Sequence, residues 1–146
     1  MEKNIAQKIN PYLSNLVVLY TKLHDQHWNV KGKMFVQVHL YTESRYDDLA
    51  EKFDAVAEKV LMLGEKPVST MKEYLEFATI KELEKKDYTC TEVLEEVLKD
   101  TETLKKQAQE LHDAFDKEGL FTIVMMMEDH IASYEKEIWF LKSMLA

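Results

Sequence analysis

Hydrophobic residues recur in steps of three and four along most of the chain, which is the spacing of one face of an α-helix. Polar and charged residues fill the positions between them, so each series describes an amphipathic segment. The four series cover residues 5–32, 35–63, 89–119 and about 121–146. The pattern therefore predicts four long helices.

The ends of these helices carry recognisable signals. At the first helix, Asn10 and Pro11 leave two interpretations open: the helix begins there, with Asn10 as its N-cap and Pro11 at its first position, or Pro11 kinks a longer helix. Gly32 is predicted to end that helix. The third helix opens at Thr89, whose spacing to Glu92 is typical of a capping box.

A long connection separates the second and third helices. It spans roughly 25 residues, 64–88, which is more than a tight turn between helices needs. A short helix is predicted within it from Met71 to Ala78, opened by the capping pair Thr70 and Glu73. Because a connection of this length can travel along a whole bundle, the third helix is predicted to run parallel to the second. We therefore expect an all-α, ferritin-like four-helix bundle with a short helix in the crossover, forming a single domain over residues 1–146.

Composition agrees with this fold and excludes several functions. Only three Gly and two Pro occur in 146 residues, too few for an all-β fold with frequent turns. The formal net charge of -8 disfavours attraction of the whole surface to nucleic acid or anionic lipid. The single cysteine, Cys90, excludes an intrachain disulfide and fits a reducing compartment. Since no apolar run approaches the length of a membrane span, we expect a cytoplasmic protein.

Metal-binding residue types gather on one flank of the second helix. With His39 set to zero and about 100° per residue, Glu43 lies near 40°, Asp54 near 60° and Glu58 near 100°. The apolar stripe of that helix centres near 300° on the same scale. The flank also holds apolar or small residues that would be poorly placed in water: Val36, Leu40, Ala50, Ala57 and Leu61. This combination predicts a contact with another subunit.

Spacing along the helix axis predicts how the ligands meet. His39 and Asp54 are fifteen positions apart, roughly 22 Å at 1.5 Å per residue, so one chain cannot bring both to one ion. Two copies packed antiparallel about a two-fold axis would bring His39 and Glu43 of one chain to Asp54 and Glu58 of the other. His27, near the end of the first helix, would complete each pocket.

Such a mixture of ligands suits iron. Imidazole nitrogen holds Fe(II), and carboxylate oxygens stabilise Fe(III), so the set predicts oxidation chemistry. The usual di-iron centre inside a bundle uses Glu-x-x-His on two helices, and no Glu here has a His three residues later. We therefore expect a centre between subunits rather than within one chain.

The chain resembles the Dps mini-ferritins, including their neutrophil-activating branch. The resemblance covers nearly the whole chain and is carried by these residues: His27-Trp28-Asn29-Val30-Lys31-Gly32, Phe35, His39, Glu43, Asp54, Ala57-Glu58-Lys59, Leu63-Gly64-Glu65-Lys66-Pro67 and Glu135-Lys136-x-x-Trp139. It implies a hollow homododecamer that oxidises Fe(II), preferably with hydrogen peroxide, and stores ferric mineral. Such a ferroxidase would limit oxidative stress.

The resemblance also implies specific roles for residues. The family's iron ligands correspond to His27 and His39 of one chain and to Asp54 and Glu58 of its partner. Glu43 departs from the pattern, because many members have Asp at that position, but its longer carboxylate still reaches a metal.

Binding to DNA is not expected to be strong. Family members that coat DNA often have a basic extension before the first helix, whereas only Lys3 and Lys8 precede Pro11 here. The alternative hypothesis is a structural shell that compacts DNA and has little ferroxidase activity. A third, a protein acting on host cells, is suggested only by the neutrophil-activating branch.

Overall fold

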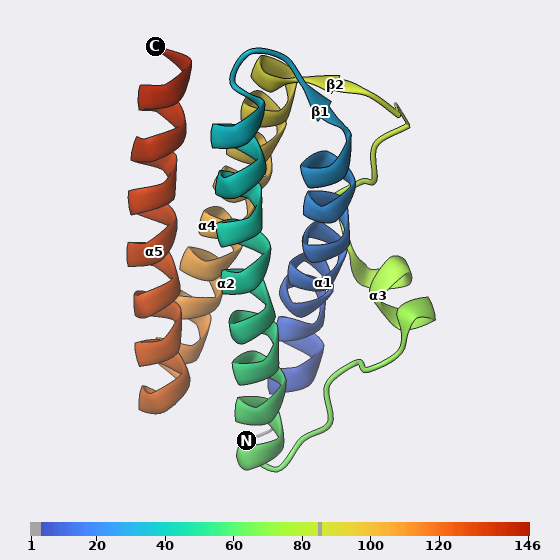
Figure 1. Cartoon of the computed structure of the whole chain (residues 1–146). Helices are drawn as coiled ribbons and strands as arrows, with labels where there is room; N and C mark the ends of the chain where they lie inside the picture. Colours follow the sequence, from blue (N-terminus) through green and yellow to red (C-terminus); the bar gives the residue numbers. More distant parts are fainter. Residues whose placement is uncertain (1–3, 85) are drawn as a thin grey trace.

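Four long helices lie side by side in the computed structural model, which describes residues 4–84 and 86–146 (Figure 1). In chain order the elements are α1 (Ile5–Asn29), β1 (Val30–Lys31), α2 (Phe35–Met62), α3 (Met71–Phe77), β2 (Tyr88–Thr89), α4 (Cys90–Lys117) and α5 (Phe121–Leu145). The crossover returns along the bundle, so α4 runs in the same direction as α2 (Figure 1). The predicted all-α bundle with a short crossover helix is confirmed. Within the described residues, we find no helix with the length and apolar character to cross a membrane.

Pro11 lies inside α1, which settles the two interpretations of the first helix. The helix begins at Ile5, and both Ile5 and Ile9 are fully buried ahead of the proline. Their burial offsets the cost of an interior proline, about 3 kcal/mol. Asn10 is not an N-cap: its side-chain oxygen accepts a hydrogen bond from the backbone N–H of Val68, at 3.1 Å.

The prediction that α1 continues to Gly32 is wrong by three residues. Val30 is already extended, with φ -71° and ψ 141°, and residues 30–31 pair in parallel with residues 88–89. This two-residue ladder, which the hydrophobic pattern did not predict, ties the end of α1 to the start of α4. Gly32 has φ +135°, where side chains are strained, and an added Cβ would lie 3.3 Å from Cys90 Sγ.

Asn15 holds the long crossover against α1. Its side-chain oxygen accepts hydrogen bonds from the backbone N–H groups of Thr79 and Ile80, at 2.7 and 2.9 Å. Its amide nitrogen donates to Gln107 of α4, at 2.9 Å. Asn15 is fully buried, so it satisfies backbone donors that the coil would otherwise leave unpaired in the interior.

Both predicted capping boxes are confirmed. The N–H of Glu73 donates to Thr70 Oγ1 at 3.2 Å, and the N–H of Thr70 donates to the Glu73 carboxylate at 3.1 Å. Thr89 and Glu92 make the same reciprocal pair at 3.1 and 3.0 Å. These pairs stabilise the N-termini of α3 and α4.

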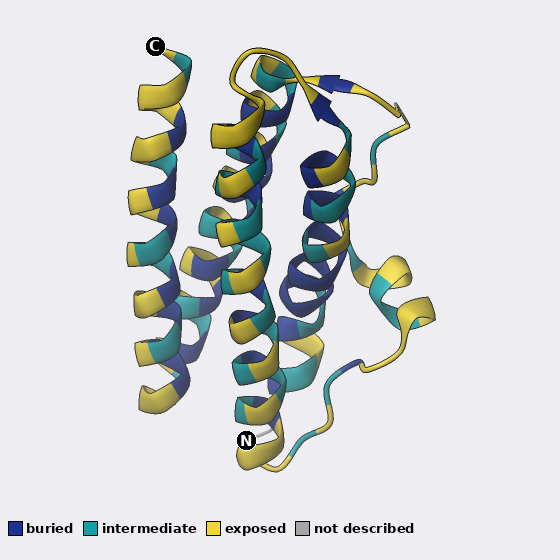
Figure 2. Ribbon diagram, viewed as in Figure 1, coloured by how far each residue is buried: buried dark blue, intermediate teal, exposed yellow. Residues whose placement is uncertain are grey.

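Helix α2 has two faces, as the pattern predicted. Leu49, Val56 and Val60 are buried in the bundle. On the other flank, Val36, Leu40 and Leu61 are between 54% and 59% exposed. Figure 2 shows buried and exposed residues alternating along α2. An exposed apolar flank on a helix that is already packed is typical of a contact surface.

A buried ion pair joins α1 to α4. The Lys22 ammonium lies 2.6 Å from Asp100 and 2.9 Å from Glu96, and its side chain is only 1% exposed. Burial raises the pKa of Asp100, while the hydrogen bond from Lys22 opposes that shift. Each charge is therefore tolerated in the interior only because its partner is present.

Replacing Lys22 by methionine should destabilise the protein by about 3–5 kcal/mol, because Asp100 would be left buried without a counter-charge. Denaturant unfolding at fixed protein concentration measures this change. The matched control is Lys105→Met, which removes a partly exposed pair with Glu135 at 3.7 Å and should cost less than about 1 kcal/mol. Equal losses in the two variants would contradict the interpretation.

Candidate metal half-site at the junction of α1 and α2

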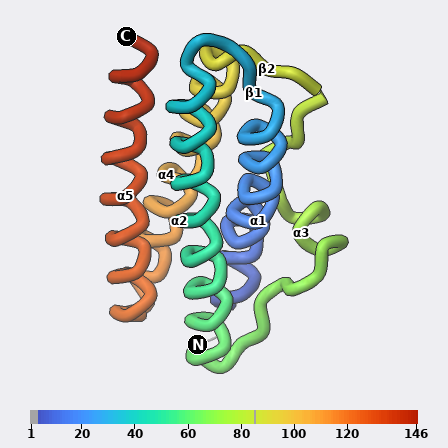
Figure 3. The backbone as a smooth tube through the Cα atoms, viewed as in Figure 1, coloured from blue at the N-terminus to red at the C-terminus, as the bar shows by residue number. Residues whose placement is uncertain are grey.

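Two histidines meet where α1 ends and α2 begins. The chain reverses direction over residues 30–34, so the first turns of α2 lie beside the last turn of α1 (Figure 3). The rings of His27 and His39 stack with their centroids 3.6 Å apart and an interplanar angle of 14°. Phe35 also stacks on His39, with the ring centroids 5.0 Å apart. Three ring systems from the two helices therefore pack at one point.

Reciprocal hydrogen bonds orient both imidazoles. His27 Nδ1 lies 2.6 Å from the carbonyl oxygen of His39, and His39 Nδ1 lies 2.9 Å from that of His27. Since a carbonyl only accepts, each Nδ1 carries the proton when these bonds form. The Nε2 lone pair of each neutral ring is then available to a metal ion.

Thr42 supports this arrangement, although the sequence did not single it out. It is fully buried, and its hydroxyl lies 3.2 Å from His27 Nδ1. The same hydroxyl donates to the carbonyl oxygen of Val38 at 2.9 Å. Its position three residues after His39, on the same helix face, is the only signal that could have suggested it.

Glu43 is the carboxylate that the chain itself brings to the histidines. One of its oxygens lies 3.9 Å from His27 Nε2, and its side chain is about half exposed. Metal bonds to nitrogen and oxygen are about 2.1 Å long, so one ion fits between these two atoms. His27, with His39 stacked on it and Glu43 nearby, is therefore a candidate for part of a metal site.

The other two predicted ligands lie elsewhere. Asp54 and Glu58 are exposed on α2. Along the helix axis, Asp54 lies roughly 22 Å from His39, and Glu58 lies roughly 22 Å from Glu43. Across residues 4–84 and 86–146, no three His, Cys, Asp or Glu side chains come together as a metal site. The fold thus places His27 beside both His39 and Glu43, and it leaves Asp54 and Glu58 apart from them.

Three polar side chains in the bundle interior are paired with one another. Tyr12 Oη lies 2.8 Å from His130 Nδ1 and 2.5 Å from the Tyr134 hydroxyl, and all three residues are buried. Burial raises the pKa of both tyrosines and lowers the pKa of His130 to about 4, with the Lys52 charge adding to the latter shift. His130 is therefore neutral near pH 7 and is engaged inside the core.

The acid sensitivity of folding should depend on His130. Its folded-state pKa of about 4 lies below the unfolded value of about 6.5, so the unfolded chain takes up the proton first. The free energy of unfolding should fall by up to about 3 kcal/mol as the pH drops from 6.5 to 4. His130→Gln keeps a polar partner for Tyr12 and should remove that part of the pH dependence of the free energy of unfolding. Denaturant titrations at a series of pH values measure this dependence.

His112 is the control for this measurement. Its hydrogen bonds to Asp113 and Glu128 raise its pKa, so its contribution has the opposite sign and is lost as the pH rises. His112→Gln should leave the loss of stability in acid in place. An unchanged slope in His130→Gln would contradict the prediction.

Comparisons with known proteins agree with the fold. A family model described as a ferritin-like domain matches residues 6–146. The chain is 36% identical over 133 residues to the DNA protection during starvation protein of Helicobacter pylori, covering 91% of this chain and 92% of that protein.

Solved structures give the same result. The Helicobacter cinaedi protein CAIP has a TM-score of 0.94 and 37% identity, covering 97% of this chain and 99% of that one. The Dps protein of Vibrio cholerae O1, described as a member of a broad superfamily of ferritin-like diiron-carboxylate proteins, has a TM-score of 0.94 and 29% identity, covering 98% and 89%.

Proposed function

The chain belongs to the Dps family of ferritin-like proteins, and from this membership we propose that it is a ferroxidase that stores iron. In this proposal it oxidises Fe(II), preferably with hydrogen peroxide, inside a hollow homododecamer in the cytoplasm. The ferric product is retained as mineral, which limits oxidative damage. The net charge of -8 favours attraction of iron cations.

The distribution of ligands along α2 carries the proposal. His39 and Glu43 lie at one end of its exposed flank, beside His27 of α1, and Asp54 and Glu58 lie towards the other end. Antiparallel packing of two α2 helices about a two-fold axis would complete two equal sites. The exposed Val36, Leu40 and Leu61 would be buried by the same contact, so the apolar flank and the divided ligand set have one explanation.

The histidine and carboxylate ligands would then have different roles in the reaction. The Nε2 atoms of His27 and His39 bind Fe(II), and the carboxylates of Glu43, Asp54 and Glu58 favour Fe(III) once electrons have left. Two Fe(II) ions give one electron each to one peroxide molecule, whose O–O bond breaks. With two protons, this yields two Fe(III) ions and two water molecules, and no hydroxyl radical is released.

The double variant His27→Ala, His39→Ala should lose catalysed oxidation. After anaerobic loading with Fe(II) and addition of peroxide, the growth of ferric absorbance should fall to the uncatalysed rate. His112→Ala, which removes an imidazole on α4, should retain the rate of the unmodified protein. A double variant as fast as that protein would exclude these histidines from the site.

Mixing subunits tests whether the site is shared. Subunits carrying His27→Ala and His39→Ala are reassembled with subunits carrying Asp54→Asn and Glu58→Gln. Random mixing makes about half of the dimers mixed, and in each mixed dimer one of the two shared sites is intact. Mixing should therefore restore about a quarter of the activity. Light scattering confirms assembly of each sample. If reassembled particles remain inactive, the site does not lie across this two-fold contact.

A structural DNA-compacting shell is the second candidate, because the Helicobacter pylori relative is named for DNA protection. The acidic charge of this chain opposes it, and binding through DNA phosphates weakens steeply with salt. A gel-shift titration should therefore show no stable complex at about 150 mM salt. Retention of DNA at that salt concentration would favour the structural function.

A further inference from the structure

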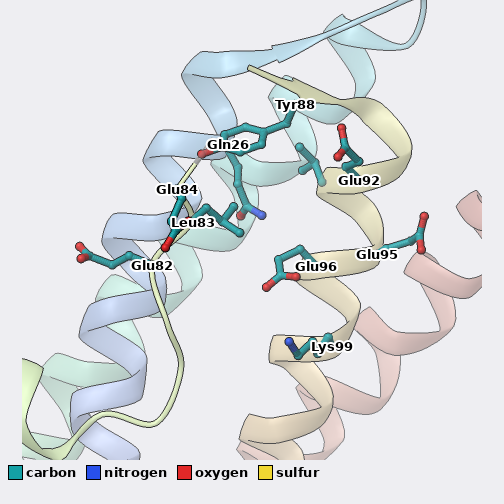
Figure 4. Close-up of a pocket in the computed structure, with 10 residues that line it drawn as sticks. Gln26, Glu82, Leu83, Glu84, Tyr88, Glu92, Glu95, Glu96 and Lys99 are labelled. Carbon is teal, nitrogen blue, oxygen red and sulfur yellow. The ribbon is translucent and has the colours of Figure 1, made fainter. Parts of the chain in front are cut away.

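An acidic groove lies between the end of α1, the start of α4 and the coil at residues 82–84. Its cavity has a volume of about 610 Å³. The side chains that line it are Gln26, Glu82, Leu83, Glu84, Tyr88, Glu92, Val93, Glu95, Glu96 and Lys99 (Figure 4). Among the described residues that line it, five carboxylates face one ammonium, so the groove is acidic.

Gln26 at the floor of this groove is incompletely satisfied. The residue is fully buried, and neither its amide nitrogen nor its amide oxygen has a hydrogen-bond partner among the described residues. Figure 4 shows its amide directed from α1 into the space between α1 and α4. A buried amide left without partners costs free energy, so it favours a ligand that supplies both an acceptor and a donor.

The arrangement of charges indicates what kind of cation fits. In the described part of the chain, the carboxylates do not converge as a metal site. Glu96 shares the Lys22 ammonium, at 2.9 Å, with Asp100. Glu82 and Glu84 lie on the coil, whereas Glu95 lies on α4, so the negative charge is spread over both sides of the groove. Spread carboxylates suit spaced ammonium groups better than a single ion.

We propose that this groove binds an extended, lysine-bearing peptide segment of a partner protein. A peptide group matches the Gln26 amide at two points, because its C=O accepts from Nε2 and its N–H donates to Oε1. Lysine ammonium groups pair with the glutamates, and their methylene stems pack on Leu83 and Val93. Because the Gln26 side chain is fully buried, this contact requires the residues that cover it to move.

Binding is measured by calorimetry on the assembled protein with the capped peptide acetyl-Lys-Ala-Lys-amide. Gln26→Leu, which keeps the bulk but removes both polar atoms, should weaken binding about tenfold or more. Glu84→Gln should weaken it as well, whereas Glu135→Gln, an equal charge change on α5, should not. Circular dichroism and light scattering check that each variant folds and assembles.

Two further probes decide the class of ligand. A capped peptide with glutamine in place of both lysines should not bind, and methyl NMR signals of Leu83 and Val93 should shift only with the lysine peptide. The polyamine spermidine has the charge but no peptide group, so it should bind more weakly. Equal binding of spermidine, equal effects of Glu84→Gln and Glu135→Gln, or no effect of Gln26→Leu would each overturn the proposal.

Discussion

Two hydrogen bonds join the end of α1 to the start of α2, each from an imidazole Nδ1 to the carbonyl oxygen of the other histidine. They stack the rings of His27 and His39 and leave both Nε2 atoms for a metal ion. The reversal of the chain between the helices is held in turn by the ladder of β1 with β2 and by Gly32. Three of the five proposed ligands thus depend on one helix junction.

The contrast between the interior and the exposed flank of α2 explains why the proposed site lies at the surface of a single chain. Inside the bundle, Lys22 is paired with Asp100 and Glu96, and His130 is held neutral beside Tyr12. A cluster of unpaired carboxylates there would lose more hydration than it could regain. On the flank, Asp54 and Glu58 are exposed to water, which a partner subunit and a cation would replace in the proposed site.

Much of the fold could be predicted because its signals are local. Helix lengths followed from apolar spacing, and the starts of α3 and α4 followed from pairs such as Thr89 with Glu92. The ladder of β1 with β2 and the role of Asn15 could not be predicted, since each joins residues about sixty positions apart. The start of α1 was ambiguous because the free-energy cost of a proline inside a helix is a local effect. The burial of Ile5 and Ile9, which offsets that cost, depends on tertiary packing.

The sequence by itself determined which residues share a face: His39, Glu43, Asp54 and Glu58 project from one flank of α2 because helical geometry repeats regularly. It also determined that His39 and Asp54 are too far apart for one ion. Only the tertiary structure decided that His27 stacks on His39, that Thr42 supports the pair, and that Gln26 is buried with no partner among the residues the structure describes. These features depend on which helices meet and on how the chain reverses between them, and no local pattern encodes that geometry.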